Sequence, residues 1–183
     1  MTETVLVLVA VSALYWLLVL VEVRRLYSTP LTATAAVPAS VLVLKPVRGL
    51  DDAATENLES FCRQDYPEME VLFGVADPED PVVPVVDDVA SRCHKARVVV
   101  GSGPGTNPKA AVLEVLAKEA SNSVIVVSDS DMRVGPDYLT AVVTALEDPK
   151  VGLVTCPYRG VEAGTLTARV EPARFHSLER PTQ

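Results

Sequence analysis

Short apolar runs alternate with segments of helical periodicity along most of this 183-residue chain, and this alternation limits the folds that it can adopt. Apolar runs typical of buried strands lie at residues 40–44, 70–76, 97–100, 123–127 and 151–156. Between and after these runs, apolar residues recur at helical spacing in the segments 54–62, 82–95, 109–120 and 139–146. Strands that alternate with helices of this length predict βαβ units. We therefore expect an α/β fold in which a mostly parallel sheet is flanked by helices.

The chain begins with an apolar segment that is set apart from the alternating pattern. Residues 5–21 carry no formal charge and would form a helix about 26 Å long, against a hydrocarbon core of about 30 Å. Arg24 and Arg25 follow, and positive residues flank the cytosolic end of a membrane helix. We predict a single-pass transmembrane signal anchor at 1–27, a linker at 28–38, and a cytosolic remainder held at the membrane. A cleaved signal peptide and a buried core helix are the alternatives.

The charge and the cysteine pattern exclude several functions. The net charge is −8, from 16 Lys and Arg against 24 Asp and Glu, which argues against a nucleic-acid binder that works by neutralising phosphates. The three cysteines, Cys62, Cys93 and Cys156, show no CxxC spacing, and the chain has only two histidines. A disulfide framework and a zinc site are therefore not expected.

Ligands of parallel α/β sheets bind at the carboxyl ends of the strands, so residues that follow each predicted strand should face one crevice. Asp129 and Asp131 follow the predicted strand 123–127, with Ser130 between them. Two carboxylates at this spacing can both approach one Mg²⁺ or Mn²⁺, which prefers oxygen ligands and keeps positions for water and substrate phosphates. In the alternative interpretation, one aspartate caps the next helix and the other is solvated.

Three further segments with polar groups follow predicted strands. Lys45 follows the first strand, and Asp77 and Asp80 follow the second, where Asp77 is placed to accept a hydrogen bond from a nucleotide base or ribose. The glycine-rich segment 101–108 leads into a helix at Lys109, where free backbone N–H groups and the lysine charge suit an anion. In the alternative interpretations, Asp77 belongs to an Asp-Pro turn without a ligand, and the segment 101–108 is a flexible connection.

The order and spacing of these motifs resemble the ceramide glucosyltransferase family of GT-A glycosyltransferases, which have a Rossmann-like fold. Within that family the chain looks most like the bacterial glycosyltransferases associated with hopanoid biosynthesis. The resemblance covers residues 38–160 and is carried by Val43-Leu44-Lys45-Pro46 with Gly49, Glu56-Asn57-Leu58 with Ser60-Phe61, Gln64-Asp65-Tyr66-Pro67, Phe73-Gly74-Val75, Asp77-Pro78-Glu79-Asp80-Pro81, Asn107-Pro108-Lys109, Asp129-Ser130-Asp131-Met132-Arg133-Val134 and Val151-Gly152-Leu153-Val154.

This resemblance implies an inverting transfer of a hexose from a UDP-sugar to a membrane lipid such as a ceramide or a hopanoid. It also implies that Asp129 and Asp131 hold a divalent cation, Mn²⁺ or Mg²⁺, on the donor diphosphate. The residues that match the donor-binding positions of the family are Lys45, Asp77, Asp80, Asn107, Lys109 and Asp129.

The family pattern continues beyond the donor half of the site. A later aspartate acts there as general base, and a Q/R-x-x-R-W motif follows it, but neither feature is found after Gly160. We therefore expect residues 39–160 to form a partial GT-A nucleotide-sugar-binding domain and residues 161–183 to form a divergent tail. The chain is expected to be truncated at its C-terminal end and to lack its catalytic base.

Two other functions fit parts of the sequence. Phosphotransferases of the haloacid dehalogenase type also use an apolar strand that ends in DxD, with the first aspartate as nucleophile, although that strand usually begins the domain. The second possibility is a membrane-tethered remnant that binds a nucleotide without turning it over.

Overall fold

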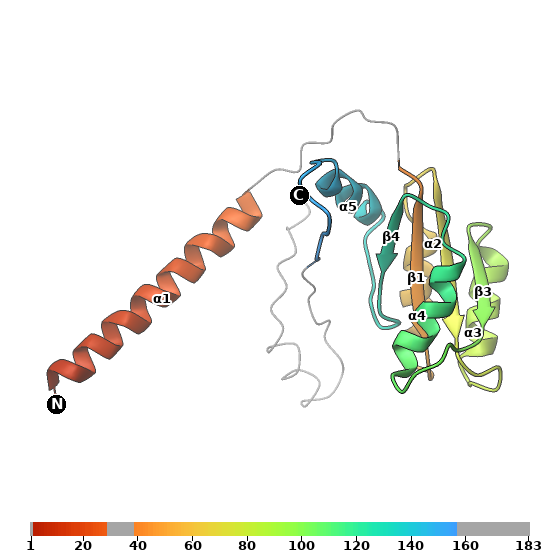
Figure 1. Cartoon of the computed structure of the whole chain (residues 1–183), viewed down its shortest axis with the longest axis horizontal. Coiled ribbons are helices and arrows are strands. Elements are labelled where there is room, and N and C mark those ends of the chain that lie inside the picture. Colours follow the sequence, from red (N-terminus) through yellow and green to blue (C-terminus); the bar gives the residue numbers. More distant parts are fainter. Residues whose placement is uncertain (1, 29–38, 157–183) are drawn as a thin grey trace. The chain divides into compact units, whose positions relative to one another are not determined.

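The structure is a computed structural model that describes residues 2–28 and 39–156. It contains a long N-terminal helix, α1 (Thr2–Ser28), and an α/β unit, and each is described by itself (Figure 1). The predicted linker, apart from its first residue, and the predicted tail at 161–183 lie outside the described residues.

The α/β unit is built on a four-stranded sheet in which all pairs of neighbouring strands are parallel. The strands, in spatial order, are β3 (Ala96–Val100), β2 (Met69–Val75), β1 (Val41–Val47) and β4 (Val124–Val127). Val41 pairs with Met69 on one side and with Val124 on the other, so the carboxyl ends of all four strands lie at one edge. This arrangement confirms the predicted α/β class with a mostly parallel sheet.

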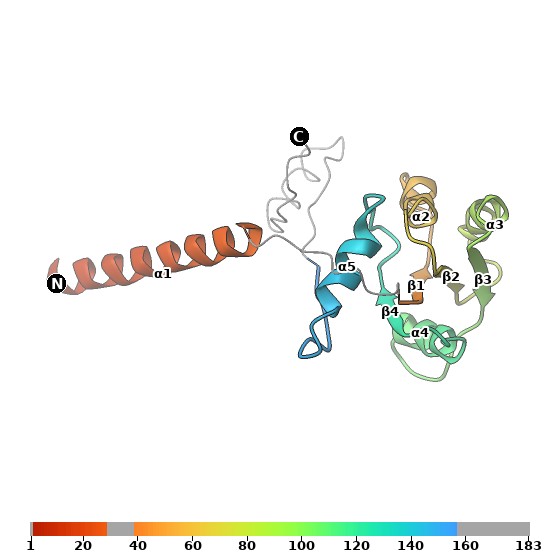
Figure 2. The same ribbon diagram turned by 90° about the horizontal axis from the view of Figure 1, so that it is seen from above.

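Helices cover both faces of the sheet, because successive side chains of a strand point to opposite faces. One face carries α2 (Ala54–Cys62), α3 (Val83–Arg92) and α5 (Tyr138–Leu146), and the other carries α4 (Pro108–Lys118) (Figures 1 and 2). The larger core therefore includes Val41 and Val43 with Phe61 of α2. The smaller core places Leu42 and Leu44 against α4.

β1 extends three residues beyond its predicted end, so the prediction that Lys45 follows the strand was wrong. Lys45 and Pro46 lie inside β1, opposite Phe73 and Gly74 of β2. A proline is tolerated at this position because β4 pairs with β1 only as far as Leu44, so the missing N–H falls beyond the end of β4.

The prediction of a fifth strand at 151–156 was also wrong. These residues have no regular secondary structure, and the Leu153 side chain is 80% exposed. None of the described strands pairs with this segment, and an apolar run without such a partner gains no ladder hydrogen bonds. Within the described part of the chain, β4 is therefore an edge strand.

Gly74 of β2 lets α4 approach the sheet closely. A Cβ at this position would lie 2.5 Å from Val112 Cγ1 and 2.8 Å from Leu116 Cδ1, both on α4. We expect Gly74→Ala to lower the free energy of unfolding by about 1–3 kcal/mol, the usual cost of overpacking a core. Thermal unfolding followed by circular dichroism would measure this loss. Gly152→Ala is the control, since a Cβ there meets nothing within 4 Å, and equal stability of the two variants would contradict the prediction.

Helix α1 has the length and composition of a membrane span. A candidate span covers Thr2–Arg25 with a mean hydropathy of 2.7. Large apolar side chains are exposed along the helix, among them Trp16, at 67%. Such a helix near an N-terminus fits a membrane anchor or a signal sequence.

Candidate functional site

A cavity of ≈ 390 Å³ opens at the edge of the sheet where β1 and β4 end. Three chain segments far apart in sequence supply most of its wall: the end of β1 with the following turn, the start of α4, and the turn after β4. The lining residues are Pro46, Val47, Arg48, Asp51, Ala76, Asn107, Pro108, Lys109, Val112, Asp129, Ser130 and Asp131. The cavity thus combines carboxylates with cations at the place where parallel sheets bind ligands.

The start of α4 places a lysine ammonium beside one of these carboxylates. Asn107 caps the helix, since its side-chain oxygen accepts a hydrogen bond from the backbone N–H of Ala110 at 3.2 Å, and Pro108 occupies the first turn. The Lys109 ammonium, in that same turn, forms an ion pair with the Asp129 carboxylate. Both side chains are about half exposed, at 50% and 56%, so the pair is accessible from solvent.

Lys45 of β1 stabilises the turn after β4 through hydrogen bonds from its buried side chain. Its side chain is fully buried, and its ammonium donates hydrogen bonds to the backbone carbonyls of Asp129 and Met132 and to the Ser128 hydroxyl. The same nitrogen lies 4.1 Å from the ring centroid of Phe61, a cation–π contact. Burial lowers the pKa of Lys45 from 10.5 to about 7, although the charges of Asp131 and Asp129 act in the opposite direction.

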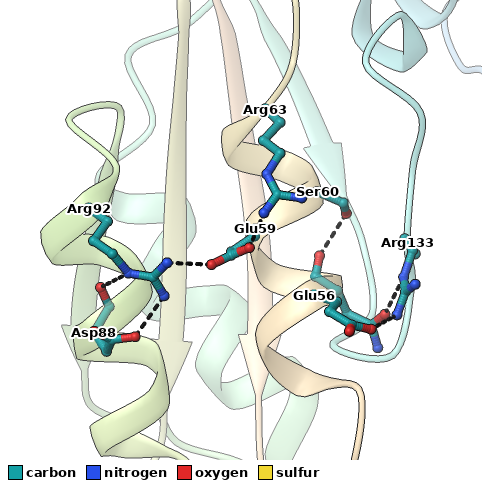
Figure 3. A network of polar contacts seen from close by, with 8 residues as sticks. Glu56, Glu59, Ser60, Arg63, Asp88, Arg92 and Arg133 are labelled. Atoms are coloured by element: carbon teal, nitrogen blue, oxygen red, sulfur yellow. Dashed lines mark hydrogen bonds and ion pairs between the residues drawn. The ribbon is translucent and has the colours of Figure 1, made fainter.

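A second set of contacts fixes the same turn from the side of α2 (Figure 3). Arg133, two residues beyond Asp131, forms an ion pair with Glu56, and its Nε donates to Asn57 Oδ1 at 3.2 Å. Further along α2, Glu59 accepts a hydrogen bond from Arg92 of α3 at 2.6 Å. Exposed pairs of this kind contribute little stability each, about 0–1 kcal/mol. The Arg133 contacts join the turn that carries both aspartates to α2, and the Glu59–Arg92 pair joins α2 to α3.

Comparison with known proteins identifies the family. The model of glycosyl transferase family 21 matches residues 4–183. The chain belongs to glycosyl transferase family 21. It is 31% identical over 123 residues to ceramide glucosyltransferase 1 of Caenorhabditis elegans and 32% identical over 123 residues to ceramide glucosyltransferase 3 of the same organism. These matches cover 64% of this chain but 26% and 27% of the two relatives, so the chain spans about a quarter of their length.

A solved structure supports the fold of this family 21 chain. The mannosyltransferase PcManGT from Pyrobaculum calidifontis, determined in complex with GDP-Man and Mn²⁺, superimposes with a TM-score of 0.63 and 23% identity, covering 83% of this chain and 46% of that chain. This likeness confirms the predicted GT-A-like fold. Membership of the family favours the glycosyltransferase interpretation of Asp129-Ser130-Asp131 over the phosphotransferase one.

The cavity of this family 21 chain is lined by four of the residues that the sequence assigns to the donor or to the metal. They are Asn107, Lys109, Asp129 and Asp131. Lys45 lies behind the wall and acts on the turn through its hydrogen bonds.

Asp77 and Asp80, the other two assigned residues, are outside the lining and are engaged in local turns. Asp77 Oδ1 accepts from the backbone N–H of Glu79 at 2.9 Å. The Asp80 carboxylate accepts from the N–H groups of Val82, at 3.0 Å, and Gly49, at 3.1 Å. Gly49 has a φ of +70°, a left-handed conformation that favours glycine. Asp80 thereby joins the turn after β1 to the start of α3.

Two charged residues of the cavity were not predicted from the sequence. Arg48 and Asp51 line the wall from the turn after β1. The signal that points to them is their position just beyond the carboxyl end of a strand, the same criterion that selected Asp129. It did not select them because the end of β1 was predicted three residues too early.

The donor set at the turn after β4 suits a divalent cation held partly by substrate. No group of three or more His, Cys, Asp or Glu side chains with metal-site geometry occurs among residues 2–28 and 39–156. Asp129 and Asp131 are two carboxylates, and Mg²⁺ is usually bound by one or two carboxylates together with substrate phosphates and water. The Asp129 carboxylate already pairs with the positive charge of the Lys109 ammonium. The two carboxylates therefore fit the ligand chemistry of Mg²⁺ or Mn²⁺.

Proposed function

We propose that this chain binds a UDP-sugar and a divalent cation in the cavity between β1, α4 and β4, as the donor half of a membrane glycosyltransferase. The observation that carries the proposal is the meeting of Asp129 and Asp131 with Asn107 and Lys109 around one cavity in a family 21 chain. A cavity of ≈ 390 Å³ falls within the usual size of small-molecule sites. The complex of PcManGT with GDP-Man and Mn²⁺ supports a nucleotide sugar and a divalent cation as ligands, and the choice of UDP rests on the resemblance to the ceramide glucosyltransferases.

The proposed roles follow from where each side chain lies. Asp129 and Asp131 hold the cation, Mn²⁺ or Mg²⁺, and Asn107 and Lys109 bind the diphosphate from the start of α4. When bound, the cation supplies positive charge that stabilises the departing UDP. Lys45, Arg133 and Asn57 keep the turn that carries both aspartates in place. Asp77 lies outside the lining, just after the wall residue Ala76, and the sequence motif rather than its position makes it the candidate contact for the base or the ribose.

The acceptor that we propose is a membrane lipid of the ceramide or hopanoid class. Two relatives are ceramide glucosyltransferases, and α1 has the properties of a membrane span. Nucleotide sugars are soluble, whereas such lipids remain in the bilayer, so an enzyme that joins them works at the membrane surface. Arg24 and Arg25 after the apolar run support a cytosolic position for the α/β unit.

Removal of the metal tests the donor site. The full chain in detergent micelles is titrated with UDP in a calorimeter, first with Mn²⁺ and then with excess EDTA. We expect UDP binding with Mn²⁺ and a loss of affinity of at least about 10-fold on chelation, because the cation neutralises the charge of the diphosphate between two carboxylates. Equal UDP affinity under both conditions would contradict the proposed site. GDP in place of UDP measures selectivity for the base.

Transfer itself is tested separately. The full chain in nanodiscs that contain ceramide is supplied with a radiolabelled UDP-hexose, and the lipid fraction is counted. Label in the lipid supports hexosyl transfer by this chain. UDP binding without label would instead favour a nucleotide-binding protein that lacks turnover.

A further inference from the structure

The Asp129 carboxylate already carries a cationic partner from the protein itself. The Lys109 ammonium is ion-paired with Asp129 Oδ1, and no other charged side chain of the described residues contacts Asp129 through an ion pair. A divalent cation that binds Asp129 must therefore share the carboxylate with this ammonium or displace it. Sharing is unfavourable, because two like charges a few ångströms apart repel each other.

The backbone at Lys109 is held by neighbouring contacts, whereas its side chain is half exposed. The start of α4 is held by the Asn107 cap and by the hydrogen bond that the Gly103 N–H donates to the Ala111 carbonyl at 2.9 Å. Val112, one turn on, is buried against the sheet. The Lys109 side chain is half exposed and has four rotatable bonds, so it can leave Asp129 while staying at the cavity wall.

Lys45 cannot make such a move. Its ammonium is buried and bonded to the backbone carbonyls of Asp129 and Met132 at the same turn. Of the two lysines that touch the turn after β4, Lys109 is therefore the exchangeable one. A diphosphate in the cavity would offer this ammonium a new anionic partner.

We propose that Lys109 is an exchangeable counter-ion: it neutralises Asp129 until a divalent cation takes that carboxylate, and it then pairs with a phosphate oxygen of the nucleotide. This inference rests on the proposed function and adds a regulatory role at the same site. It implies that the cation alone binds weakly, since it must displace an ammonium, and that the cation and the nucleotide strengthen each other's binding. By thermodynamic linkage, each raises the affinity of the other by the same factor.

The exchange predicts opposite effects of one substitution on two ligands. In Lys109→Met, we expect Mn²⁺ alone to bind about 3-fold more tightly, because an exposed ion pair of modest strength no longer competes for Asp129. In the same variant, we expect UDP at saturating Mn²⁺ to bind about 10-fold more weakly, because a charge-assisted hydrogen bond to phosphate is lost. A purely structural lysine would lower both affinities, and a simple phosphate contact would lower only the second.

The experiment uses the full chain in detergent micelles. Electron paramagnetic resonance of free Mn²⁺ measures the binding of Mn²⁺ alone, and calorimetry measures the binding of UDP at saturating Mn²⁺. Lys118→Met is the matched control, because it removes the same charge from the same helix at a lysine that pairs with Glu114. Lys109→Arg, which keeps the charge, should restore most of the UDP affinity.

The outcomes separate the exchange from the site on which it depends. Tighter Mn²⁺ binding with weaker UDP binding in Lys109→Met, and neither change in Lys118→Met, would establish the exchange. Unchanged or weaker Mn²⁺ binding in Lys109→Met would overturn it, even where Asp131→Asn abolishes Mn²⁺ binding and so supports the metal site. If the wild-type chain binds no Mn²⁺ with or without UDP, both the exchange and the proposed function fail.

Discussion

We expect Lys45→Met to lower the stability of the α/β unit by an amount that grows as the pH rises from about 7 to about 10. Burial lowers the pKa of Lys45 in the folded chain to about 7, whereas its ordinary value is 10.5. Between these two values the unfolded chain binds one more proton at this site than the folded chain, so the folding stability of the wild type rises with pH. Below pH 7 Lys45 is protonated in both states. The stability of the wild type then no longer changes with pH through this group, and the full cost of burying the charged lysine is present.

Methionine at this position fills nearly the same volume but neither titrates nor donates hydrogen bonds. The variant leaves the carbonyls of Asp129 and Met132 without the lysine donor, at a cost of about 1–3 kcal/mol. It also lacks the pH-dependent gain of the wild type, so the difference in unfolding free energy between the two chains widens with increasing pH. Urea unfolding of the full chain in micelles at several pH values, followed by circular dichroism, measures this difference.

A matched control separates the titration from the loss of hydrogen bonds. Lys95 also donates to a backbone carbonyl, that of Tyr66, at 2.7 Å from a partly buried position. Lys95→Met therefore reports the cost of losing a lysine hydrogen bond of this kind. A constant difference in stability between wild type and Lys45→Met from about pH 6.5 to about pH 9.5 would contradict a pKa of Lys45 that burial has lowered.

The sequence pattern predicted the elements well where apolar periodicity decides the structure. The helices at 54–62 and 139–146 and the strands at 70–76 and 123–127 lie within a residue of α2, α5, β2 and β4. These segments bury one face of a helix or a whole strand, so the spacing of their apolar residues follows directly from their packing.

The pattern failed where pairing with distant strands decides the structure. Lys45 and Pro46 are poor strand residues by type, yet β2 extends β1 to Val47 through parallel pairing. Residues 151–156 have good strand composition but pair with none of the described strands. Strand propensity describes how well a residue fits a half-buried sheet, and it does not identify the neighbour that makes the sheet.

The candidate site was predictable in part, because some of its residues directly follow segments with a clear sequence pattern. Asp129 and Lys109 follow sharp boundaries, an apolar strand and a glycine-rich segment, and both line the cavity. Asp80 follows a strand equally closely, but its carboxylate binds the N–H groups of Gly49 and Val82. Whether the Asp80 carboxylate binds a ligand or a backbone N–H depends on Gly49, which lies 31 residues earlier in the chain. The spacing of residues in the sequence does not reveal this contact.

Asp131→Asn is expected to weaken Mn²⁺-dependent UDP binding by at least about 10-fold, the loss that even outer partners of a metal ligand commonly cause. Asp131 lines the cavity and makes no direct hydrogen bond within the described part of the chain, so its carboxylate is available to a cation. The amide of asparagine keeps the shape of the side chain and removes its charge. The variant should therefore fold as the wild type does, which circular dichroism verifies, while calorimetry in Mn²⁺ measures the loss of UDP affinity.

The comparison variant for this loss is Asp88→Asn, which removes one negative charge at an exposed ion pair with Arg92 of the same helix. A long-range effect of net charge on the binding of a cation or an anion would appear in both variants and would weaken in high salt. A direct metal ligand affects only the Asp131 variant and persists in high salt, because contact between a carboxylate and a divalent cation is screened little. Equal UDP affinities of the two variants in Mn²⁺ would place the cation elsewhere and would remove the basis for a donor site at the end of β4.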